Sequence, residues 1–282
     1  MRHFTIFLSF LVIAIMMGCK KKVLQINKDI SFENYVNISY GNDPDQKMDL
    51  YIPDNKTEVK DVFILIHGGG WRAGDRSILT SFIFSLMKKF PDCAFANIDY
   101  RLASRSRYAL PNQTEDIQSA ILFLENRLNK NINYILLGNS AGGHLSMLYG
   151  YQKDHAKKVK AVINIVGPSD LSDPGFKNYI DYTFVEKYLA DPKIIPADVP
   201  MAVFVSPISY ITQDSAPTLS FYGTYDTVIP LSQKKILDSA LQKNGIIHRS
   251  IEFNGNHVDW LKETHSDLLV REITEFLNSL KK

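Results

Sequence analysis

One stretch decides the fold: Tyr134-Ile-Leu-Leu-Gly-Asn-Ser140-Ala-Gly-Gly-His144. The apolar run at its start leads into Gly138-Asn-Ser-Ala-Gly142, and a helical pattern follows. Glycines two residues before and after Ser140 remove side chains that would clash across a tight turn from strand to helix. Such a turn exposes the serine hydroxyl at a helix N-terminus, where backbone N–H groups favour negative charge. Ser140 is therefore a candidate nucleophile on a strand–turn–helix unit.

Short apolar runs alternate with amphipathic segments on both sides of this unit, which is typical of parallel strands joined by crossover helices. An opening strand–turn–strand pattern, 34–40 and 46–51, predicts an antiparallel hairpin at a sheet edge. The expected fold class is therefore α/β, with a mostly parallel central sheet and helices on both faces. Further strands are predicted near 62–66, 94–98, 134–137, 159–166, 218–221 and 247–253, and helices near 78–90, 111–128, 231–243 and 260–280.

A proline-rich segment of about fifty residues, between Val166 and Thr218, interrupts this alternation. Long loops in compact domains are usually functional. We therefore expect a short cap-like insertion at about 172–206 that forms part of a substrate pocket rather than an independent domain. Its aromatic side chains are candidates for the pocket wall, although the same side chains would also serve to seal the insertion against the core. They are Phe176, Tyr179, Tyr182, Phe184 and Tyr188.

A second glycine-rich motif, His67-Gly-Gly-Gly-Trp71, directly follows a predicted strand. Consecutive glycines leave backbone amides uncovered, so a substrate oxygen can approach them closely. The amide of Ala141, the residue after Ser140, would supply a further donor. One donor of this kind stabilises an oxyanion by about 2.7–4 kcal/mol. We expect His67 itself to hold the loop by hydrogen bonding rather than to act as a base.

A serine nucleophile needs a histidine base and a carboxylate that orients the histidine. Asp226 and His257 each follow one of the last two predicted strands. Both residues therefore stand at the carboxyl edge of the sheet, where Ser140 also lies, and we expect the three to share one site. The rival candidates are less suitable, because His144 lies in the first turn of a helix, Asp238 lies inside a helix and Asp259 is too near the histidine.

The N-terminus has the features of a secretory signal peptide, which we predict for residues 1–18. A basic start precedes a mostly apolar run of about 14 residues, which is too short to span a bilayer comfortably. Gly18 and Cys19 end this run and resemble the lipobox of bacterial lipoproteins, in which the cysteine is lipidated and becomes the first mature residue. Met16 departs from the usual pattern, in which leucine is commonest.

A lipidated Cys19 implies export and attachment to a bacterial membrane, on its periplasmic or cell-surface side. Residues 19–33 would then be the lipidated cysteine and its tether, and residues 34–282 the catalytic domain. An ordinary signal peptide, or an uncleaved anchor with an incidental cysteine, is the alternative. With Cys19 modified, only Cys93 remains, and one thiol cannot form an internal disulfide.

Length and composition bound the class of protein. A chain of 282 residues fits one large domain, and 45% apolar with 22% charged residues is typical of a globular protein with a hydrophobic core. The formal net charge of +2 is spread along the chain, without a basic stripe that carries interleaved aromatic residues. We therefore expect no nucleic-acid partner.

These motifs together resemble the esterase/lipase group related to hormone-sensitive lipase, whose members have the α/β-hydrolase fold. The resemblance covers nearly everything from about residue 34 to the end. The form His67-Gly-Gly-Gly-Trp71 and the element Gly167-Pro-Ser-Asp-Leu171 look closer to its branch of bacterial acetyl and feruloyl esterases and arylformamidases. The other matching stretches are Asp99-Tyr-Arg-Leu102, Pro111 with Asp116, Gly138-Asn-Ser-Ala-Gly-Gly-His144 and Gly223-Thr-Tyr-Asp226.

The resemblance implies an oxyanion hole built from the amides of Gly69, Gly70 and Ala141. One departure from the group's pattern is Val258, next to His257, where an aromatic residue is frequent. This departure concerns the pocket wall beside the base and not the base itself. Structural rather than catalytic roles are implied for Asp99, Arg101 and Asp116.

The expected function is that of a serine hydrolase that cleaves carboxylic esters through an acyl-enzyme intermediate on Ser140. No metal or organic cofactor is implied. The expected substrates are small-molecule or carbohydrate esters, acetylated or feruloylated carbohydrates among them. Two alternatives stay open. One is an amide hydrolase that acts on arylformamides or short peptides, since the same triad serves both, and the other is a catalytically silent binding module on the hydrolase scaffold.

Overall fold

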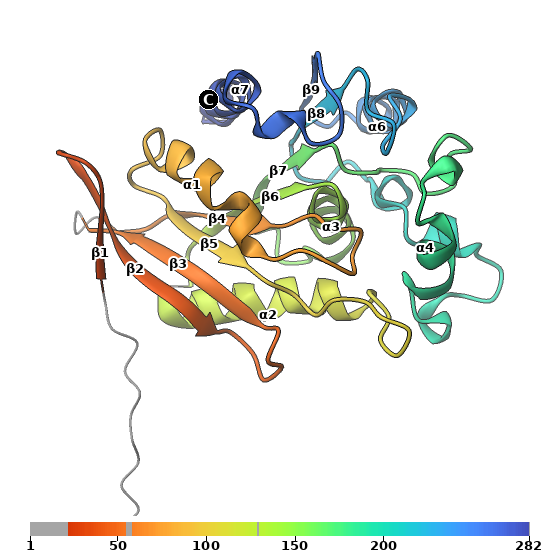
Figure 1. Cartoon of the computed structure of the whole chain (residues 1–282), viewed down its shortest axis with the longest axis horizontal. Helices are drawn as coiled ribbons and strands as arrows, with labels where there is room; N and C mark the ends of the chain where they lie inside the picture. The colour runs from red at the N-terminus through yellow and green to blue at the C-terminus, as the bar shows by residue number, and fades with distance from the viewer. Residues whose placement is uncertain (1–21, 55–57, 129, 282) are drawn as a thin grey trace, which may run out of the picture.

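A computed structural model describes residues 22–54, 58–128 and 130–281. Within these residues, nine strands form one sheet in the order β1-β2-β3-β5-β4-β6-β7-β8-β9 (Figure 1). The pairs β1–β2, β2–β3 and β3–β5 are antiparallel, whereas the other neighbouring pairs are parallel. The strands are β1 (Lys22–Asn27), β2 (Ile30–Ser39), β3 (Lys47–Pro53), β4 (Asp61–Ile66), β5 (Ala94–Ile98), β6 (Asn133–Asn139), β7 (Val159–Ile165), β8 (Thr218–Gly223) and β9 (His248–Phe253).

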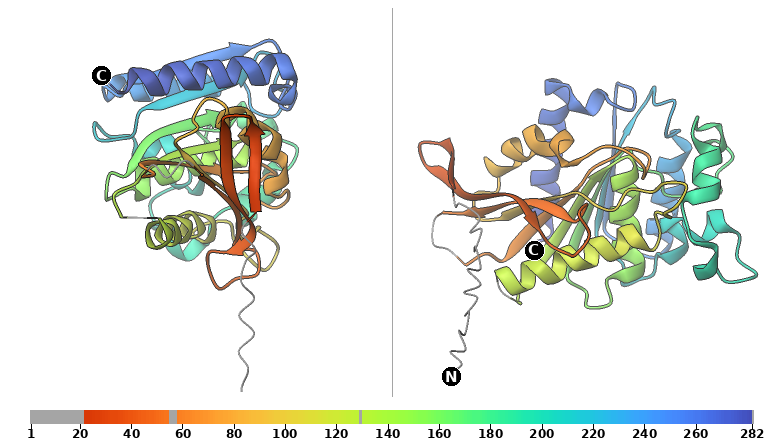
Figure 2. Two further views of the ribbon diagram at one scale, coloured as in Figure 1. Left: turned by 90° about the vertical axis from the view of Figure 1, so that its left-hand side faces the viewer. Right: turned by 60° about the horizontal axis from the view of Figure 1, so that its bottom comes forward.

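Helices cover both faces of this sheet (Figures 1 and 2). They are α1 (Thr80–Met87), α2 (Asn112–Arg127), α3 (Ala141–Leu148), α6 (Ser232–Lys243) and α7 (Glu263–Ser279). Successive side chains of β4 face two separate hydrophobic clusters: Ile64 packs in the one with α2, α3 and α6, and Phe63 and Leu65 in the one with α1 and α7. Because both faces are covered, the central strands are mainly apolar. The predicted α/β fold is confirmed.

The segment before the predicted hairpin is part of the sheet and not a tether. β1 pairs antiparallel with β2, and Lys22 lies opposite Asn34. Leu24 and Ile26 pack against the hydrophobic cluster that α1 and α7 share. The prediction of a tether over 19–33 is therefore wrong from Lys22 onward, and the sheet edge is β1. The mainly polar composition of the segment concealed the alternation of Leu24 and Ile26 with polar neighbours, which is a strand pattern.

The predicted signal peptide, 1–18, and the predicted lipidation site, Cys19, lie outside the described residues. In the part of the chain that the structure describes, no helix has the length and apolar character needed to span a membrane. The predictions of export and anchoring therefore rest on the N-terminal sequence.

The segment between β7 and β8 contains the predicted insertion, 172–206, and its described residues form short helices and loops without a strand. It lies at the end of the molecule opposite β1 (Figures 1 and 2). The N–H groups of Ala109 and Leu110 donate to the carbonyls of Tyr188 and Leu189, at 3.1 and 2.8 Å, and tie the insertion to the segment before α2. Its helices are η3 (Phe176–Asn178), α4 (Tyr182–Tyr188), η4 (Pro192–Ile194), α5 (Met201–Phe204) and η5 (Pro207–Tyr210).

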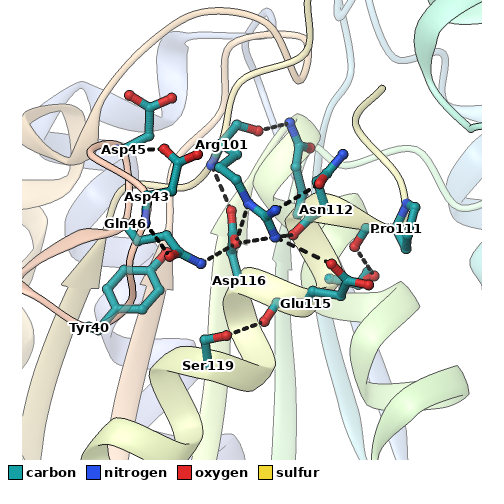
Figure 3. Close-up of polar contacts among 12 residues, drawn as sticks. Tyr40, Asp43, Asp45, Gln46, Arg101, Pro111, Asn112, Glu115, Asp116 and Ser119 are labelled. Atoms are coloured by element: carbon teal, nitrogen blue, oxygen red, sulfur yellow. Dashed lines mark hydrogen bonds and ion pairs between the residues drawn. The ribbon is translucent and has the colours of Figure 1, made fainter. Parts of the chain in front are cut away.

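A buried polar network ties the loop after β5 to α2 and to the turn between β2 and β3 (Figure 3). The Asp116 carboxylate is fully buried and accepts hydrogen bonds of 2.7 Å from Gln46 Nε2, Arg101 Nε and the Arg101 N–H. A buried carboxylate is tolerated when charge and hydrogen bonds compensate it, and Arg101 supplies both. Nearby, Asp99 pairs with Arg76. Asp99, Arg101 and Asp116 therefore make contacts within the scaffold, which agrees with the structural roles that the resemblance implies for them.

Candidate active site

The turn between β6 and α3 holds Ser140 in an unusual backbone conformation. Its φ and ψ are 54° and −122°, which a residue other than glycine rarely adopts unless the surroundings enforce it. The surroundings do so here, because a Cβ on Gly142 would lie 1.9 Å from the Ile66 carbonyl oxygen, and one on Gly138 would lie 2.2 Å from the backbone of Gly142. The Ser140 N–H also donates to the carbonyl of Ile165 at 2.8 Å. The sharp turn predicted from the two glycines is therefore present.

The structure brings the three predicted catalytic residues into one chain of hydrogen bonds. His257 Nε2 lies 2.9 Å from Ser140 Oγ, and His257 Nδ1 lies 2.8 Å from Asp226 Oδ2. The Asp226 carboxylate is fully buried, and its other oxygen accepts the N–H groups of Val228 and Ile229, at 2.8 and 2.9 Å. Since a carboxylate accepts hydrogen bonds, Nδ1 carries the proton and Nε2 is free to accept the serine hydroxyl.

The other candidate acids are engaged elsewhere. Asp259 accepts the N–H of Asn256 at 3.1 Å. Asp238 accepts the hydroxyl of Ser250. Among the described residues, His257 has a contact with Asp226 and with neither of these two carboxylates. Asp226 is therefore the carboxylate that orients the histidine.

Two further histidines near the site belong to the scaffold. The ring of His67 stacks on Tyr100 with centroids 4.3 Å apart, and its Nδ1 lies 2.6 Å from the Gly68 carbonyl oxygen. His144 Nε2 lies 2.8 Å from the carbonyl of Val205, in the insertion. Burial lowers the pKa of both rings, to about 4 for His144. Both are therefore neutral at neutral pH, and neither contacts the serine hydroxyl.

The glycine loop after β4 adopts conformations that favour glycine. Gly69 and Gly70 have φ angles of 125° and 57°, and a Cβ on Gly69 would lie 1.9 Å from the carbonyl oxygen of Ala73. The Ala73 N–H donates to the Gly69 carbonyl at 3.0 Å and closes the turn. Within the described residues, the amides of Gly69, Gly70 and Ala141 donate to no acceptor. They are the donors that remain for a substrate oxygen.

Contacts from three other elements, β6, α3 and α2, hold this loop. At its start, the Gly68 N–H donates to Asn139 Oδ1 at 2.9 Å. At its end, Trp71 Nε1 donates to His144 Nδ1 at 3.1 Å, and Gln113 Nε2 donates to the Trp71 carbonyl at 2.7 Å. Gln113 is not among the residues predicted from the sequence. Its only signal is its place in the first turn of a predicted helix, which many exposed residues share.

A cavity of about 550 Å³ lies beside Ser140 and His257. The glycine loop, the insertion and the segments after Asp226 and His257 form its walls. Its apolar side chains are Ile78, Val228, Val258, Trp260 and Leu261. Its polar side chains beyond the triad and Asn139 are Arg72, Tyr179 and Asp181. The site therefore offers both apolar and polar contacts next to the serine.

The insertion contributes to this cavity through fewer aromatic residues than the sequence suggests. Of the aromatic candidates, Tyr179 lines the cavity. Phe176 is fully buried beneath it, with ring centroids 5.6 Å apart, and Tyr182 packs on Phe176. The alternative expectation, that the aromatics seal the insertion against the core, thus holds for Phe176 and Tyr182. Asp181 is a cavity residue that the sequence analysis did not single out.

The chain is similar to several proteins that are named as esterases. The family model described as BD-FAE matches residues 48–241. Esterase LipC of Mycobacterium tuberculosis is 29% identical over 86% of this chain and 64% of its own length. The isoprenylcysteine alpha-carbonyl methylesterase ICME of Arabidopsis thaliana is 24% identical over 88% of this chain and 61% of its own length. The chain therefore spans less than two thirds of the length of these relatives.

Solved structures agree with the fold. A truncated carbohydrate esterase from gut microbiota superposes with a TM-score of 0.68 at 21% identity and covers 88% of this chain and 95% of that one. Esterase B from Lactobacillus rhamnosis, in an inhibited form, gives a TM-score of 0.72 at 20% identity, over 91% of this chain and 89% of that one. At such identities the likeness shows the α/β-hydrolase fold alone. Because the family model matches more than half of the residues, the chain belongs to the BD-FAE family.

Proposed function

We propose that this protein is a serine hydrolase that cleaves carboxylic esters through an acyl-enzyme intermediate. One observation carries the proposal: Asp226, His257 and Ser140 form a continuous chain of hydrogen bonds that ends at a cavity lined by Gly69 and Gly70. Nucleophile, base, orienting acid and free backbone donors therefore meet at one place, which is the set that acyl transfer requires.

In the proposed reaction each of these groups has its own step. Ser140 Oγ attacks the ester carbonyl carbon while His257 Nε2 takes its proton, and the carbonyl oxygen becomes negatively charged. The amides of Gly69, Gly70 and Ala141 would donate to that oxygen. His257 then returns the proton to the departing alcohol, which leaves the acyl group on Ser140. Water repeats the sequence on the acyl-enzyme, releases the carboxylic acid and restores the serine.

The relatives favour esters over the alternatives. LipC and ICME are both named as esterases, and neither name describes an amide hydrolase. The silent binding module is also disfavoured, because the complete triad is assembled at hydrogen-bond distances. Among esters, the gut carbohydrate esterase with the same fold supports small-molecule or carbohydrate esters as substrates.

The decisive test replaces the nucleophile. Ser140→Ala should abolish hydrolysis of p-nitrophenyl acetate and covalent labelling by a fluorophosphonate probe, because Oγ is the atom that both reactions need. Ser104→Ala, at an exposed serine outside the cavity, serves as the matched control and should behave as wild type. Labelling that persists in Ser140→Ala would refute the assignment. Hydrolysis of N-formylkynurenine faster than of aryl esters would favour the amide alternative.

The proposal extends to location. The lipobox-like sequence at Gly18 and Cys19 supports export and attachment of the protein to a bacterial membrane through a lipid on Cys19. Its catalytic domain would then face the periplasm or the cell exterior, where esters too large to enter the cell are accessible.

A further inference from the structure

We propose that Arg72, Tyr179 and Asp181 form a subsite that binds hydroxyl groups on the alcohol part of the ester. This inference rests on the proposed ester hydrolysis and adds to it the residues that select the alcohol. All three side chains line the cavity beside Ser140. Arg72 follows the glycine loop and the other two belong to the insertion, so the subsite forms only in the folded chain.

The three side chains contact one another beside the candidate oxyanion donors. Arg72 Nη2 lies 2.7 Å from Asp181 Oδ1, and the Tyr179 hydroxyl lies 3.5 Å from Asp181 Oδ2. The same hydroxyl oxygen would lie 2.8 Å from a Cβ placed on Gly70. Of the three polar side chains, Tyr179 therefore lies next to the glycine loop that carries the candidate oxyanion donors. A substituent on an atom near the ester carbonyl would come within its reach.

The subsite has unused hydrogen-bonding capacity. A guanidinium carries five N–H donors, and within the described residues the Arg72 side chain has Asp181 as its ion-pair partner and the face of Phe184, at 4.8 Å, as its other contact. The side chains of Arg72 and Asp181 remain 41% and 34% exposed. Since ion pairs this exposed add little to stability, their place in the cavity points to ligand binding.

Charge balance indicates a neutral ligand. Arg72 and Asp181 cancel each other, and the remaining titratable residues among those that line the cavity are His257 and Tyr179, a phenol whose pKa burial raises further. An anionic substrate would meet the Asp181 carboxylate, and a cationic one would meet the guanidinium. A hydroxyl group both donates and accepts, so it can use the spare N–H groups of Arg72 and the lone pairs of Asp181 together.

The alcohol part of the substrate suits the side of the cavity that the three polar side chains form. In an ester of a polyol, free hydroxyl groups stand on the carbons adjacent to the one that carries the esterified oxygen, close to the carbonyl that Ser140 attacks. The apolar side chains of the cavity, Ile78, Val258 and Leu261 among them, offer no partner for hydroxyl groups and suit an apolar acyl group. A small number of precisely placed polar groups is enough to give an otherwise apolar site its specificity.

The test compares two acetate esters that share an acyl group and a six-membered ring: a monoacetylated methyl xyloside and cyclohexyl acetate. The quantity measured is the ratio of their kcat/KM values. Arg72→Met and Asp181→Asn should each lower this ratio about tenfold, mainly through KM of the xyloside, because each removes charge-assisted hydrogen bonds in a half-exposed site. If Arg72→Met does not fold, Tyr179→Phe replaces it in the test. This variant removes one hydroxyl group, and it should also lower the ratio.

Arg107→Met is the matched control. Arg107 pairs with Asp45 at 2.6 Å, the two side chains are 33% and 44% exposed, and neither lines the cavity. The ratio in this variant should equal that of wild type. A ratio unchanged in Arg72→Met and Asp181→Asn, even with both esters hydrolysed more slowly, would overturn the subsite, because the ion pair would then only hold the insertion against the loop. Hydrolysis of neither ester by wild type, with no fluorophosphonate labelling of Ser140, would refute the proposed function and the subsite with it.

Discussion

Ser140, His257 and Asp226 are each positioned by contacts that do not depend on the reaction. The serine stands on a turn whose glycines leave no room for side chains, and the carboxylate is held by two backbone N–H groups. Because Asp226 is fully buried, water does not compete for its bond to the imidazole. Groups fixed in this way need little reorganisation when charge develops, which is the main source of catalytic power in such sites.

The hydrogen bonds of Asp226 predict the effect of replacing it. In Asp226→Asn, the side-chain oxygen can still accept the N–H groups of Val228 and Ile229, so its NH₂ group faces His257. Nδ1 then has to accept rather than donate, and the proton moves to Nε2, where it blocks transfer from Ser140. We expect kcat to fall about 10⁴-fold, with the melting temperature close to that of wild type.

Asp259→Asn is the control for this prediction, since it makes the same chemical change in the loop of the histidine without touching the ring. It should keep kcat within a few-fold of wild type. Equal losses in the two variants would mean that Asp226 does not orient the base.

At the scale of elements, the insertion combines a buried anchor with a cavity wall. Phe176 is fully buried in the core that α2, α3 and α6 share, and the Tyr179 ring stacks on it with one side toward the cavity. His144 joins the same insertion to α3 through the carbonyl of Val205. The insertion therefore packs as part of the domain, and its effect on the site passes through a small number of side chains.

Phe176 and Tyr179 should respond differently to truncation. Phe176→Ala leaves a cavity in the core and should cost about 3–5 kcal/mol of stability, seen as a lower melting temperature. Tyr179→Ala removes a partly exposed ring and should change the relative kcat/KM among esters more than it changes the melting temperature. If both variants lost stability alike and kept the wild-type substrate preference, the insertion would be scaffold only.

At the scale of the whole molecule, the insertion and β1 lie at opposite ends (Figures 1 and 2). Lys22, the first residue that the structure describes, belongs to β1 and follows Cys19 by three positions in the chain. A lipid on Cys19 would therefore hold the β1 edge of the domain at the membrane and leave the insertion end, with the candidate site, directed away from it. Such an arrangement suits a hydrolase whose substrates come from outside the membrane.

Metabolic labelling with an alkynyl fatty acid tests the anchor. Wild type should be labelled and should fractionate with membranes, whereas Cys19→Ser should lose both properties, because that thiol is the predicted acceptor. Cys93→Ser removes the other cysteine of the chain and should be labelled as wild type. Label retained in Cys19→Ser would exclude lipidation at this residue.

Much of the fold and the candidate site could be predicted because their signals are local. The apolar runs and helical periodicity indicated the parallel strands and their helices, and glycines around Ser140 indicated the sharp turn. Asp226 and His257 followed from one topological rule, that parallel strands carry their functional loops at the same edge. The resemblance to a known group then supplied the amides of Gly69 and Gly70. In each case a short stretch of sequence, or its position after a strand, contains the information.

The tertiary structure alone decided the features that depend on residues distant in sequence. Gln113 holds the carbonyl of Trp71, and Arg72 pairs with Asp181; neither contact leaves a local pattern, because it depends on which loops the fold brings together. β1 was missed for a related reason, since its short apolar alternation forms a strand through its pairing with β2 and its packing against the core. The sequence by itself therefore determined the chemistry of the site, and the packing of distant segments determined which side chains surround it.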